Sequence, residues 1–415
     1  MDYLPPPVFP MPIVFEFQQF RSPREGQERF AASLQLARER GQDSRPVLDW
    51  LEQADIRGPG LVFDLAAIEQ RMRWLGRVAA EFSASPLVAV KSCSETVFLE
   101  LARRHLAGFD VSNVAEYSRL PVDLAGRLVS VTSPAMVDAP EAFLGRGNQL
   151  VVTVDSRLQL ERHLAREGQS DYILRIRSSD LLEGRRPLDP AYYPGSRFGF
   201  SPDEVGQLLQ DSAVRKKPPA GFHVHHGSEK NSAATYKILI EGMAQLASLL
   251  DAPPRYINLG GGWHRLAASA IREVLLSARS HFPAPCVLLF EPGRWYGEGA
   301  GYAVGSIVNI ARTGKIVRCT LDLSGKSHLH WSMPTLLHTF DERYSEGGAV
   351  QIFGPSCYES DFVGKFYLPC AGDVIRDAGL DFGSRLVFGN VSTYSLEWNT
   401  SFNGVPAANV HWCRL

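Results

Sequence analysis

Residues 255–294 read RYINLGGGWHRLAASAIREVLLSARSHFPAPCVLLFEPGR, and this stretch decides the expected fold. It starts with a short apolar run, turns at three glycines, continues with apolar residues at helical spacing and ends in a second apolar run. Apolar runs that alternate with amphipathic segments are typical of parallel strands buried on both faces. The stretch therefore predicts a strand–helix–strand unit.

The same pattern recurs upstream. Amphipathic segments such as SETVFLELARRH (94–105) and AATYKILIEGMAQLASLL (233–250) separate the apolar runs. Eight such runs between residues 86 and 293 match an α/β fold, the (β/α)8 TIM barrel. The runs are PLVAVKS (86–92), AGFDVS (107–112), RLVSVTS (127–133), QLVVTVDS (149–156), DYILRIRS (171–178), AGFHVHHGS (220–228), RYINLGGG (255–262) and CVLLFEPG (286–293).

After Gly293 the pattern changes to short alternating strands with Gly, Pro and Asn turns, which is typical of an antiparallel β domain. We therefore expect three parts. Residues 1–57 form an N-terminal extension that packs on the β domain, residues 58–302 the barrel, and residues 303–415 the C-terminal β domain.

Composition narrows the class of protein. The formal net charge of -2 over 415 residues gives no reason to expect nucleic acid or an anionic membrane as a partner. No apolar run approaches the roughly 20 residues of a membrane span. The start, MDYLPPPVFPMPIVFEF, has no basic leader, and the six cysteines form no CxxC pair. We expect reduced thiols and a cytoplasmic protein.

Reactive groups of barrel enzymes lie at the C-terminal ends of the strands. A lysine buried at such an end is costly to desolvate unless it is paired or used covalently, although a lysine that extends to the rim is the plainer alternative. The polar residues that close the runs are Lys91, Asp110, Arg175, His223, His225, Ser228, Gly260, Gly261, Gly262, Glu291 and Arg294.

The last two runs predict a phosphate site. Barrel phosphate sites are built by the loops after strands 7 and 8, where this chain has Gly260–Gly262 and Arg294. Glycines let backbone N–H groups approach a phosphate, and an arginine adds a charged fork. Glu291 could keep a pyridine nitrogen protonated, or simply pair with Arg294.

The stretch FHVHHGS (222–228) allows several uses. A histidine ring can lie over a flat cofactor and Ser228 can donate to phosphate, but a His-x-His pair also suits zinc. No further ligand at a comparable strand end completes a metal set, so we expect no metal. A purely structural histidine network is the plainer alternative.

Taken together, the motifs resemble the fold-type III, alanine racemase-like PLP (pyridoxal 5'-phosphate) decarboxylases of ornithine, diaminopimelate and carboxynorspermidine. The resemblance runs from about Val62 to Gly404. It rests on AVKS at Lys91, GFDVSNVAEY (108–117), SRFGF (196–200), HVHHGS, NLGGG, EPGR, GPSCYESD (354–361) and STYSLEWNTSFNG (392–404).

This resemblance implies a PLP-binding barrel, with Lys91 carrying PLP as a Schiff base. His225 would stack on the pyridine ring, Glu291 would pair with its nitrogen, and Asp110, Glu116 and Arg175 would line the lysine. The implied phosphate contacts are Ser228, Gly260, Gly261, Gly262, Arg294 and Tyr394. Cys357 would enter the site from the partner subunit of a homodimer.

The substrate is harder to infer from these motifs. Tyr358 follows the motif cysteine where the ornithine and diaminopimelate enzymes have an acid, while LDLSGKSHLH (321–330) looks closest to carboxynorspermidine decarboxylase. We expect removal of the α-carboxylate from a diamino acid or a carboxy-polyamine-like substrate. The residues expected to bind it are Asp322, His328, Glu359 and Asp361.

Three other functions fit parts of the pattern. An amino-acid racemase on the same fold needs a second base facing the lysine, where this chain offers a cysteine motif and extra acids. A non-catalytic binding protein would not need Lys91, Glu291 and Cys357 together. A metal-dependent barrel hydrolase would need ligands beyond the histidine pair.

Overall fold

The computed structural model describes residues 45–54, 56, 58–135, 140–166, 170–183, 196–227, 232–297, 299–313, 316–332, 334–336, 347–369 and 381–415. The chain forms two compact units. The barrel unit spans Glu69–Tyr296, and the β domain combines residues 45–68 with Gly297–Leu415. In the described part of the chain, no helix is long and apolar enough to cross a membrane.

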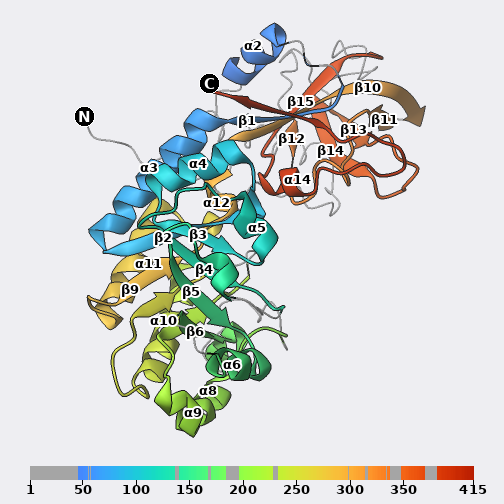
Figure 1. The fold of residues 1–415 in the computed structure, drawn as a ribbon. Helices are drawn as coiled ribbons and strands as arrows, with labels where there is room; N and C mark the ends of the chain where they lie inside the picture. The colour runs from blue at the N-terminus through green and yellow to red at the C-terminus, as the bar shows by residue number, and fades with distance from the viewer. Residues whose placement is uncertain are drawn as a thin grey trace. The chain divides into compact units, whose positions relative to one another are not determined.

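The barrel unit contains a closed ring of parallel strands in the order β2-β3-β4-β5-β6-β7-β8-β9. Figure 1 shows β2 to β6 following one another in this unit. Each of the eight expected runs overlaps one of these strands, so the predicted TIM barrel is confirmed. The strands are β2 (Ala84–Ala89), β3 (Gly108–Val111), β4 (Leu128–Thr132), β5 (Gln149–Val154), β6 (Asp171–Ile176), β7 (Gly221–Val224), β8 (Tyr256–Asn258) and β9 (Val287–Phe290).

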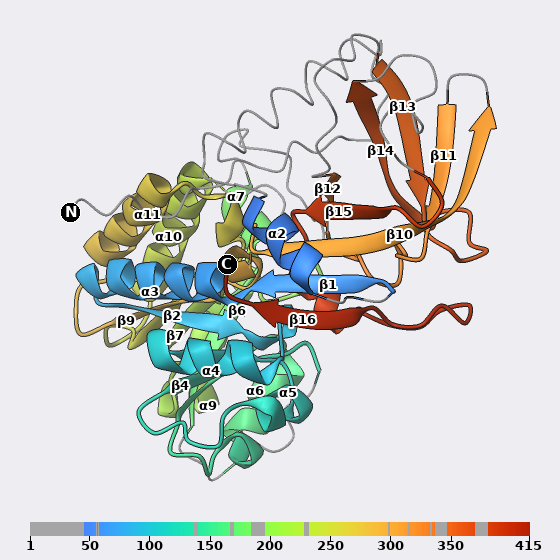
Figure 2. The ribbon, with the colours of Figure 1, turned by 90° about the horizontal axis from the view of Figure 1, so that it is seen from above.

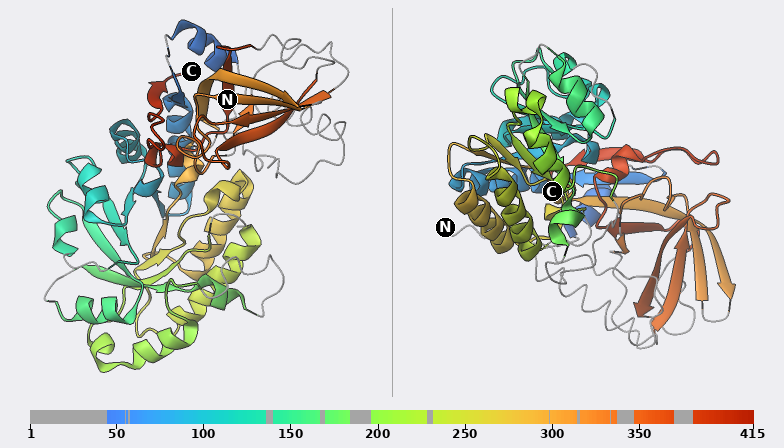
Figure 3. Two further views of the ribbon diagram at one scale, coloured as in Figure 1. Left: turned by 90° about the vertical axis from the view of Figure 1, so that its right-hand side faces the viewer. Right: turned by 90° about the horizontal axis from the view of Figure 1, so that it is seen from below.

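Helices surround the strands, as Figure 3 shows. In α10, Tyr236, Ile240 and Met243 are buried at helical spacing, and the Ser232 side chain caps the first turn. The helices and 3-10 turns are α3 (Leu65–Glu81), η1 (Val90–Ser92), α4 (Thr96–His105), α5 (Val114–Arg119), η2 (Pro140–Phe143), α6 (Arg157–Leu164), α7 (Ser178–Leu182), α8 (Pro202–Gln210), α9 (Ser212–Lys216), α10 (Ala233–Ala247), η3 (Trp263–Arg265), α11 (Ala268–His281) and α12 (Arg294–Gly297).

The β domain is one sheet with the path β12-β15-β10-β11-β13-β14, to which β1 is added beside β10 and β16 beside β1. Figure 2 shows β16 running alongside β1. The elements are α2 (Arg45–Gln53), β1 (Gly60–Asp64), β10 (Gly301–Thr313), β11 (Ile316–Leu321), β12 (Thr335–Leu336), β13 (Gly347–Phe353), β14 (Phe362–Pro369), β15 (Arg385–Gly389), α14 (Tyr394–Glu397) and β16 (Asn409–Cys413).

Most pairs in this sheet are antiparallel, as expected, but β1–β16 and β11–β13 are parallel. Parallel pairing needs a long crossover, and the two partners lie far apart in the chain in the first case. The division into compact units also differs from the boundary that we expected at residue 58. Residues 60–64 belong to the β domain because their backbone pairs with β10 and β16.

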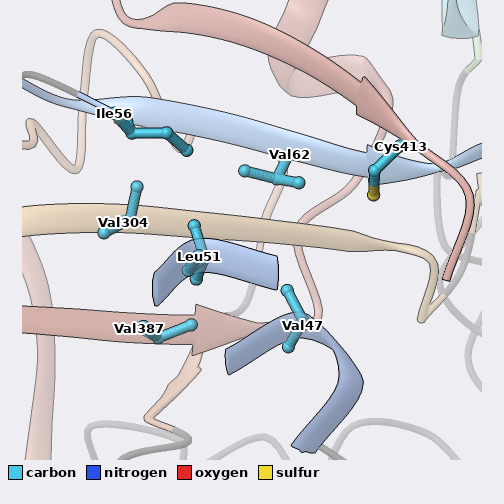
Figure 4. Close-up of a cluster of buried hydrophobic side chains, with 7 residues drawn as sticks. All are labelled: Val47, Leu51, Ile56, Val62, Val304, Val387 and Cys413. Carbon is cyan, nitrogen blue, oxygen red and sulfur yellow. The ribbon is translucent and has the colours of Figure 1, made fainter. Parts of the chain in front are cut away.

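The helix α2 packs on this sheet through Val47 and Leu51, which lie one turn apart on the same face. Figure 4 shows their side chains against Val62, Val304 and Val387. Fully burying one such aliphatic side chain contributes about 1.5–3 kcal/mol. Of the N-terminal extension, residues 1–44 lie outside the described residues.

Candidate active site

In a closed parallel barrel, all C-terminal strand ends meet on one rim. Lys91 follows β2 on that rim, in the 3-10 turn η1. The sequence led us to consider a lysine buried at the strand end. The structure instead places Lys91 exposed, because the turn takes it out of the strand. Its positive charge acts on Asp110, His225 and Glu291, so the lysine lies within electrostatic range of all three.

Glu291 follows β9 and is buried. Its Oε1 accepts a hydrogen bond from the side-chain amide of Asn258, and its Oε2 lies 3.7 Å from Nε2 of His223. Burial alone would raise the pKa of this carboxyl, but His223, Lys91 and Asn258 together lower it to about 2. Glu291 is therefore a carboxylate near neutral pH.

Asp110, at the end of β3, behaves in the opposite way. It is buried, and its Oδ1 has no hydrogen-bond partner among the described residues. Burial and the charge of Glu291 raise the pKa of Asp110 well above its usual value, although Lys91 opposes the shift. Two carboxyl groups on one rim thus have their pKa values moved apart, which is typical of functional sites.

His225 follows β7 and is held by the glycine turn. The Gly261 N–H donates to its Nδ1 over 2.9 Å, so Nδ1 is the unprotonated nitrogen. Burial, together with the charges of Lys91 and Arg175, lowers the pKa of His225 well below its usual value. The ring is therefore neutral, with its proton on Nε2.

The glycine turn leaves no room for a side chain at Gly260 or at Gly261. Gly260 has φ +64°, and a Cβ there would lie 2.4 Å from the carbonyl oxygen of Val224. A Cβ on Gly261 would lie 2.9 Å from Cε1 of His225. Only glycine permits this close approach.

Arg175, on β6, donates from Nη1 to Oδ1 of Asp155 over 3.1 Å. Its guanidinium also lies 4.4 Å from the ring centroid of Phe198, in the SRFGF segment. Glu116 accepts a hydrogen bond from the backbone N–H of Ser112 at 2.7 Å, which ties it to the loop after β3.

Of the two side chains expected to bind the phosphate beside the glycines of the barrel, Arg294 and Ser228, the structure describes only Arg294. Arg294 is partly buried and starts the short helix α12 directly after the end of β9. Ser228 lies outside the described residues.

The expected residues of the β domain lie on its loops. Cys357 and Glu359 are exposed, and the Cys357 N–H donates to Oδ1 of Asn403 over 2.8 Å. Tyr394 starts α14, with its ring 6.1 Å from that of Trp331.

Asp361 and His328 have a geometry that favours a structural role over the expected substrate contact. Asp361 is 1% exposed and accepts hydrogen bonds from the hydroxyls of Ser324 and Ser356. His328 is fully buried, with Nδ1 accepting from the Ser324 N–H and Nε2 lying 2.9 Å from the carbonyl oxygen of Pro406. Asp322 is half-buried, and its Oδ1 accepts from the Ser306 N–H.

Two residues of the rim were not among the expected ones. Asn258 ends β8 and connects Glu291 with the N–H of Gly260. Asp155 follows β5 and pairs with Arg175. Both are polar residues that close an apolar run, so the strand-end criterion applied to every run would have found them.

Comparison with known proteins identifies the family. The family model described as pyridoxal-dependent decarboxylase, pyridoxal binding domain, matches residues 65–298. The chain belongs to the pyridoxal-dependent decarboxylase family. A chloroplastic ornithine decarboxylase of Nicotiana glauca is 24% identical over 400 residues, covering 89% of this chain and 87% of that protein. A diaminopimelate decarboxylase of Vibrio cholerae is 23% identical over 394 residues, covering 86% and 89%.

Solved structures show the same fold. The arginine decarboxylase of Paramecium bursaria Chlorella virus, bound to agmatine, superposes with a TM-score of 0.73 at 19% identity. The match covers 89% of this chain and all of that one. The resemblance drawn from the motifs is therefore confirmed, and PLP is the cofactor of this decarboxylase.

The rim has the features that PLP needs. Asp110 Oδ1 and Nδ1 of His223 are buried without a hydrogen-bond partner among the described residues. Such groups need a partner, which a polar cofactor can supply. The side-chain-free turn at Gly260 and Gly261 is shaped for a phosphate. Among the described residues, no group of three His, Cys, Asp or Glu side chains could hold a metal ion.

We expect Asp110→Asn to stabilise the apoprotein and to do so more as the pH rises. The pKa of Asp110 is raised in the folded protein, so folding retains a proton that the unfolded chain releases above its usual pKa of 3.8. Stability is therefore lost as the pH rises from 3.8 to the raised pKa of folded Asp110. The asparagine side chain does not titrate, so the variant avoids this loss. The gain should be on the order of 1–3 kcal/mol near neutral pH.

Chemical denaturation at pH about 4 and about 8 measures this difference. Asp251→Asn, at an exposed position outside the helices, is the control and should change stability at neither pH. An equal effect of Asp110→Asn at both pH values would contradict the raised pKa.

Proposed function

We propose that this decarboxylase removes the α-carboxylate of an amino acid with a second polar end, with Lys91 holding PLP as a Schiff base. The observation that supports this most is the convergence of Lys91, Asp110, His225 and Glu291 on one barrel rim. The α-carboxylate leaves as CO2, and one proton takes its place on the α-carbon.

The substrate class is proposed as a diamino acid or a carboxy-polyamine-like compound. The named relatives act on ornithine and on diaminopimelate, both of which have a second charged end. In this chain the exposed Glu359 supports the same class, because a carboxylate can pair with a distal ammonium group.

The roles of the chain's own residues follow from their chemistry. When bound, PLP takes up the electron pair of the broken bond. His225, neutral and rigidly held, offers a flat ring for stacking, and Glu291 holds a negative charge for the pyridine nitrogen. Arg294 and the glycine turn offer donors for the phosphate. Cys357 is proposed to deliver the proton to the α-carbon.

An amino-acid racemase is the alternative, and product analysis separates the two. Wild type and Cys357→Ala should be incubated with basic and diacidic amino acids while CO2, pyridoxamine phosphate and substrate chirality are measured. We expect CO2 and amine from the wild type. The variant should slow by about 10²- to 10⁴-fold in the proton-delivery step and form more pyridoxamine phosphate.

If the wild type racemised its substrate and released no CO2, the proposed decarboxylation would be wrong and the racemase reaction would be supported. An unchanged amine yield from Cys357→Ala would remove this cysteine from the reaction.

We further propose a homodimer whose sites are shared between subunits. Cys357 belongs to a loop of the β domain and not to a barrel strand. The same domain exposes large aromatic side chains that a second copy could cover, namely Trp331, Tyr358, Trp398 and Phe402.

Mixing Lys91→Ala subunits with Cys357→Ala subunits tests the sharing. One of the two sites in a mixed dimer then keeps both residues, so about a quarter of the wild-type activity should return in an equal mixture. No recovery, when subunit exchange is verified by mass, would place both residues in one subunit.

A further inference from the structure

Two buried aromatic residues donate hydrogen bonds to the backbone carbonyls of the glycine turn. The Trp263 indole N–H donates to the carbonyl oxygen of Gly260 over 2.7 Å. The Tyr236 hydroxyl donates to the carbonyl oxygen of Gly261. Burial raises the pKa of Tyr236, so its hydroxyl keeps the proton that it donates. The two rings pack together with centroids 4.9 Å apart, and both residues are only 1% exposed.

These two bonds, and a third from the Glu291 backbone N–H to the Gly260 carbonyl at 2.9 Å, determine which way the peptide groups face. In a trans peptide, the carbonyl and the N–H point in opposite directions. Since the Gly260 carbonyl faces Trp263, the Gly261 N–H points away from it and meets Nδ1 of His225 at 2.9 Å. The Gly261 N–H is therefore already used to hold the histidine.

The peptide group between Gly261 and Gly262 is oriented by Tyr236. Because the Gly261 carbonyl faces Tyr236, the N–H of Gly262 points away from that ring. Gly262 has φ +90° and stands directly before the 3-10 turn η3, which Trp263 starts. Successive N–H groups at such a left-handed turn form an anion-binding concavity.

We propose that Tyr236 is a positioning residue, which orients the Gly262 N–H toward the cofactor phosphate through the carbonyl of Gly261. The inference rests on the proposed phosphate site at the glycine turn and Arg294. Tyr236 does not touch the phosphate in this arrangement, and the peptide group that it holds is not the one whose N–H meets His225. Its effect should therefore be confined to ligands that have a phosphate.

The test compares PLP with pyridoxal, which lacks the phosphate but still reacts with Lys91. Apoprotein is titrated with each aldehyde, and binding is followed by absorbance. Tyr236→Phe keeps the aromatic ring and removes the hydroxyl that donates to the Gly261 carbonyl. We expect about 5- to 10-fold weaker PLP binding and unchanged pyridoxal binding for this variant. Competition by inorganic phosphate against PLP should weaken in the same proportion. Trp263→Phe removes the donor to the Gly260 carbonyl, whose peptide group serves His225, so it should not weaken PLP binding selectively.

Two control variants are measured in the same way, one expected to have no effect on binding and one expected to weaken PLP binding alone. Tyr172→Phe removes a buried hydroxyl that donates to the Lys217 carbonyl over 2.7 Å, near the start of β6, and should change neither affinity. Arg294→Ala should weaken PLP binding by about 10- to 100-fold and leave pyridoxal binding unchanged.

The possible failures are distinguishable. If Arg294→Ala weakens PLP binding selectively but Tyr236→Phe does not, the positioning role is overturned and the phosphate site stands. Equal losses of PLP and pyridoxal binding in Tyr236→Phe would mean a general structural role and would overturn the proposal as well. If wild type and all variants bind PLP and pyridoxal alike, the phosphate site itself is wrong.

Discussion

Lys91→Ala is expected to abolish turnover, with CO2 release falling by about 10²- to 10⁴-fold or more. The substitution removes the amino group proposed to hold PLP and the positive charge that acts on Asp110 and Glu291. Phosphate contacts do not involve this residue, so the variant should still bind PLP. The bound PLP should lack the absorbance of a protein Schiff base.

Borohydride reduction of the wild type followed by peptide mapping gives direct evidence for the lysine. The pyridoxyl group should be on the peptide that contains Lys91. Lys326→Ala is a matched control, since Lys326 is also exposed but lies in the β domain, and its activity should be unchanged. A label on Lys326 or Lys365 would overturn the assignment.

Glu291→Gln is expected to lower kcat by about 10²- to 10³-fold, the usual effect of losing one preorganised electrostatic contact. Glutamine has the same shape and can still accept a hydrogen bond from Asn258, but it has no charge for a protonated pyridine nitrogen. The ring of bound PLP should no longer be kept protonated in the variant. A pH titration followed by the absorbance of bound PLP should therefore differ from that of the wild type.

The same variant should also destabilise the apoprotein. The pKa of Glu291 falls from 4.5 to about 2 on folding, so its ionised form stabilises the protein above pH 4.5, and this stability is lost as the pH falls toward 2. Removing it should cost roughly 2–4 kcal/mol at neutral pH and much less in acid.

Glu273→Gln is the matched control for Glu291→Gln. Glu273 forms an ion pair with Lys237 at the surface, where such pairs contribute about 0–1 kcal/mol. Its activity and its stability should stay close to those of the wild type. Normal kcat and an unaltered cofactor titration in Glu291→Gln would exclude the proposed role at the ring nitrogen.

The sequence by itself determined the barrel and most of its rim. The eight apolar runs overlap the eight strands because hydrophobic periodicity is a local property that neighbouring residues share. The polar residue that closes a strand must lie on the rim, whatever else the fold does. Lys91, Asp110, Arg175 and Glu291 could therefore be selected before any contact was known.

Only the tertiary structure decided what these residues touch. No local pattern indicates that residues 60–64 pair with residues 409–413, since the two strands are separated by almost the whole chain. The roles of Asp361 and His328 likewise depend on partners from distant loops, which bury both side chains and use their polar atoms. Hydrogen-bond partners distant in sequence become neighbours only when the chain folds, so periodicity contains no record of them.

The glycine turn shows both contributions at one place. Three consecutive glycines after an apolar run predict a close backbone approach, and the structure has one at Gly260 and Gly261. The orientation of that backbone is decided by donors outside the three glycines, namely Tyr236 on α10, Trp263 and the backbone N–H of Glu291. A glycine imposes no direction on its own peptide groups, so only the folded surroundings can supply one.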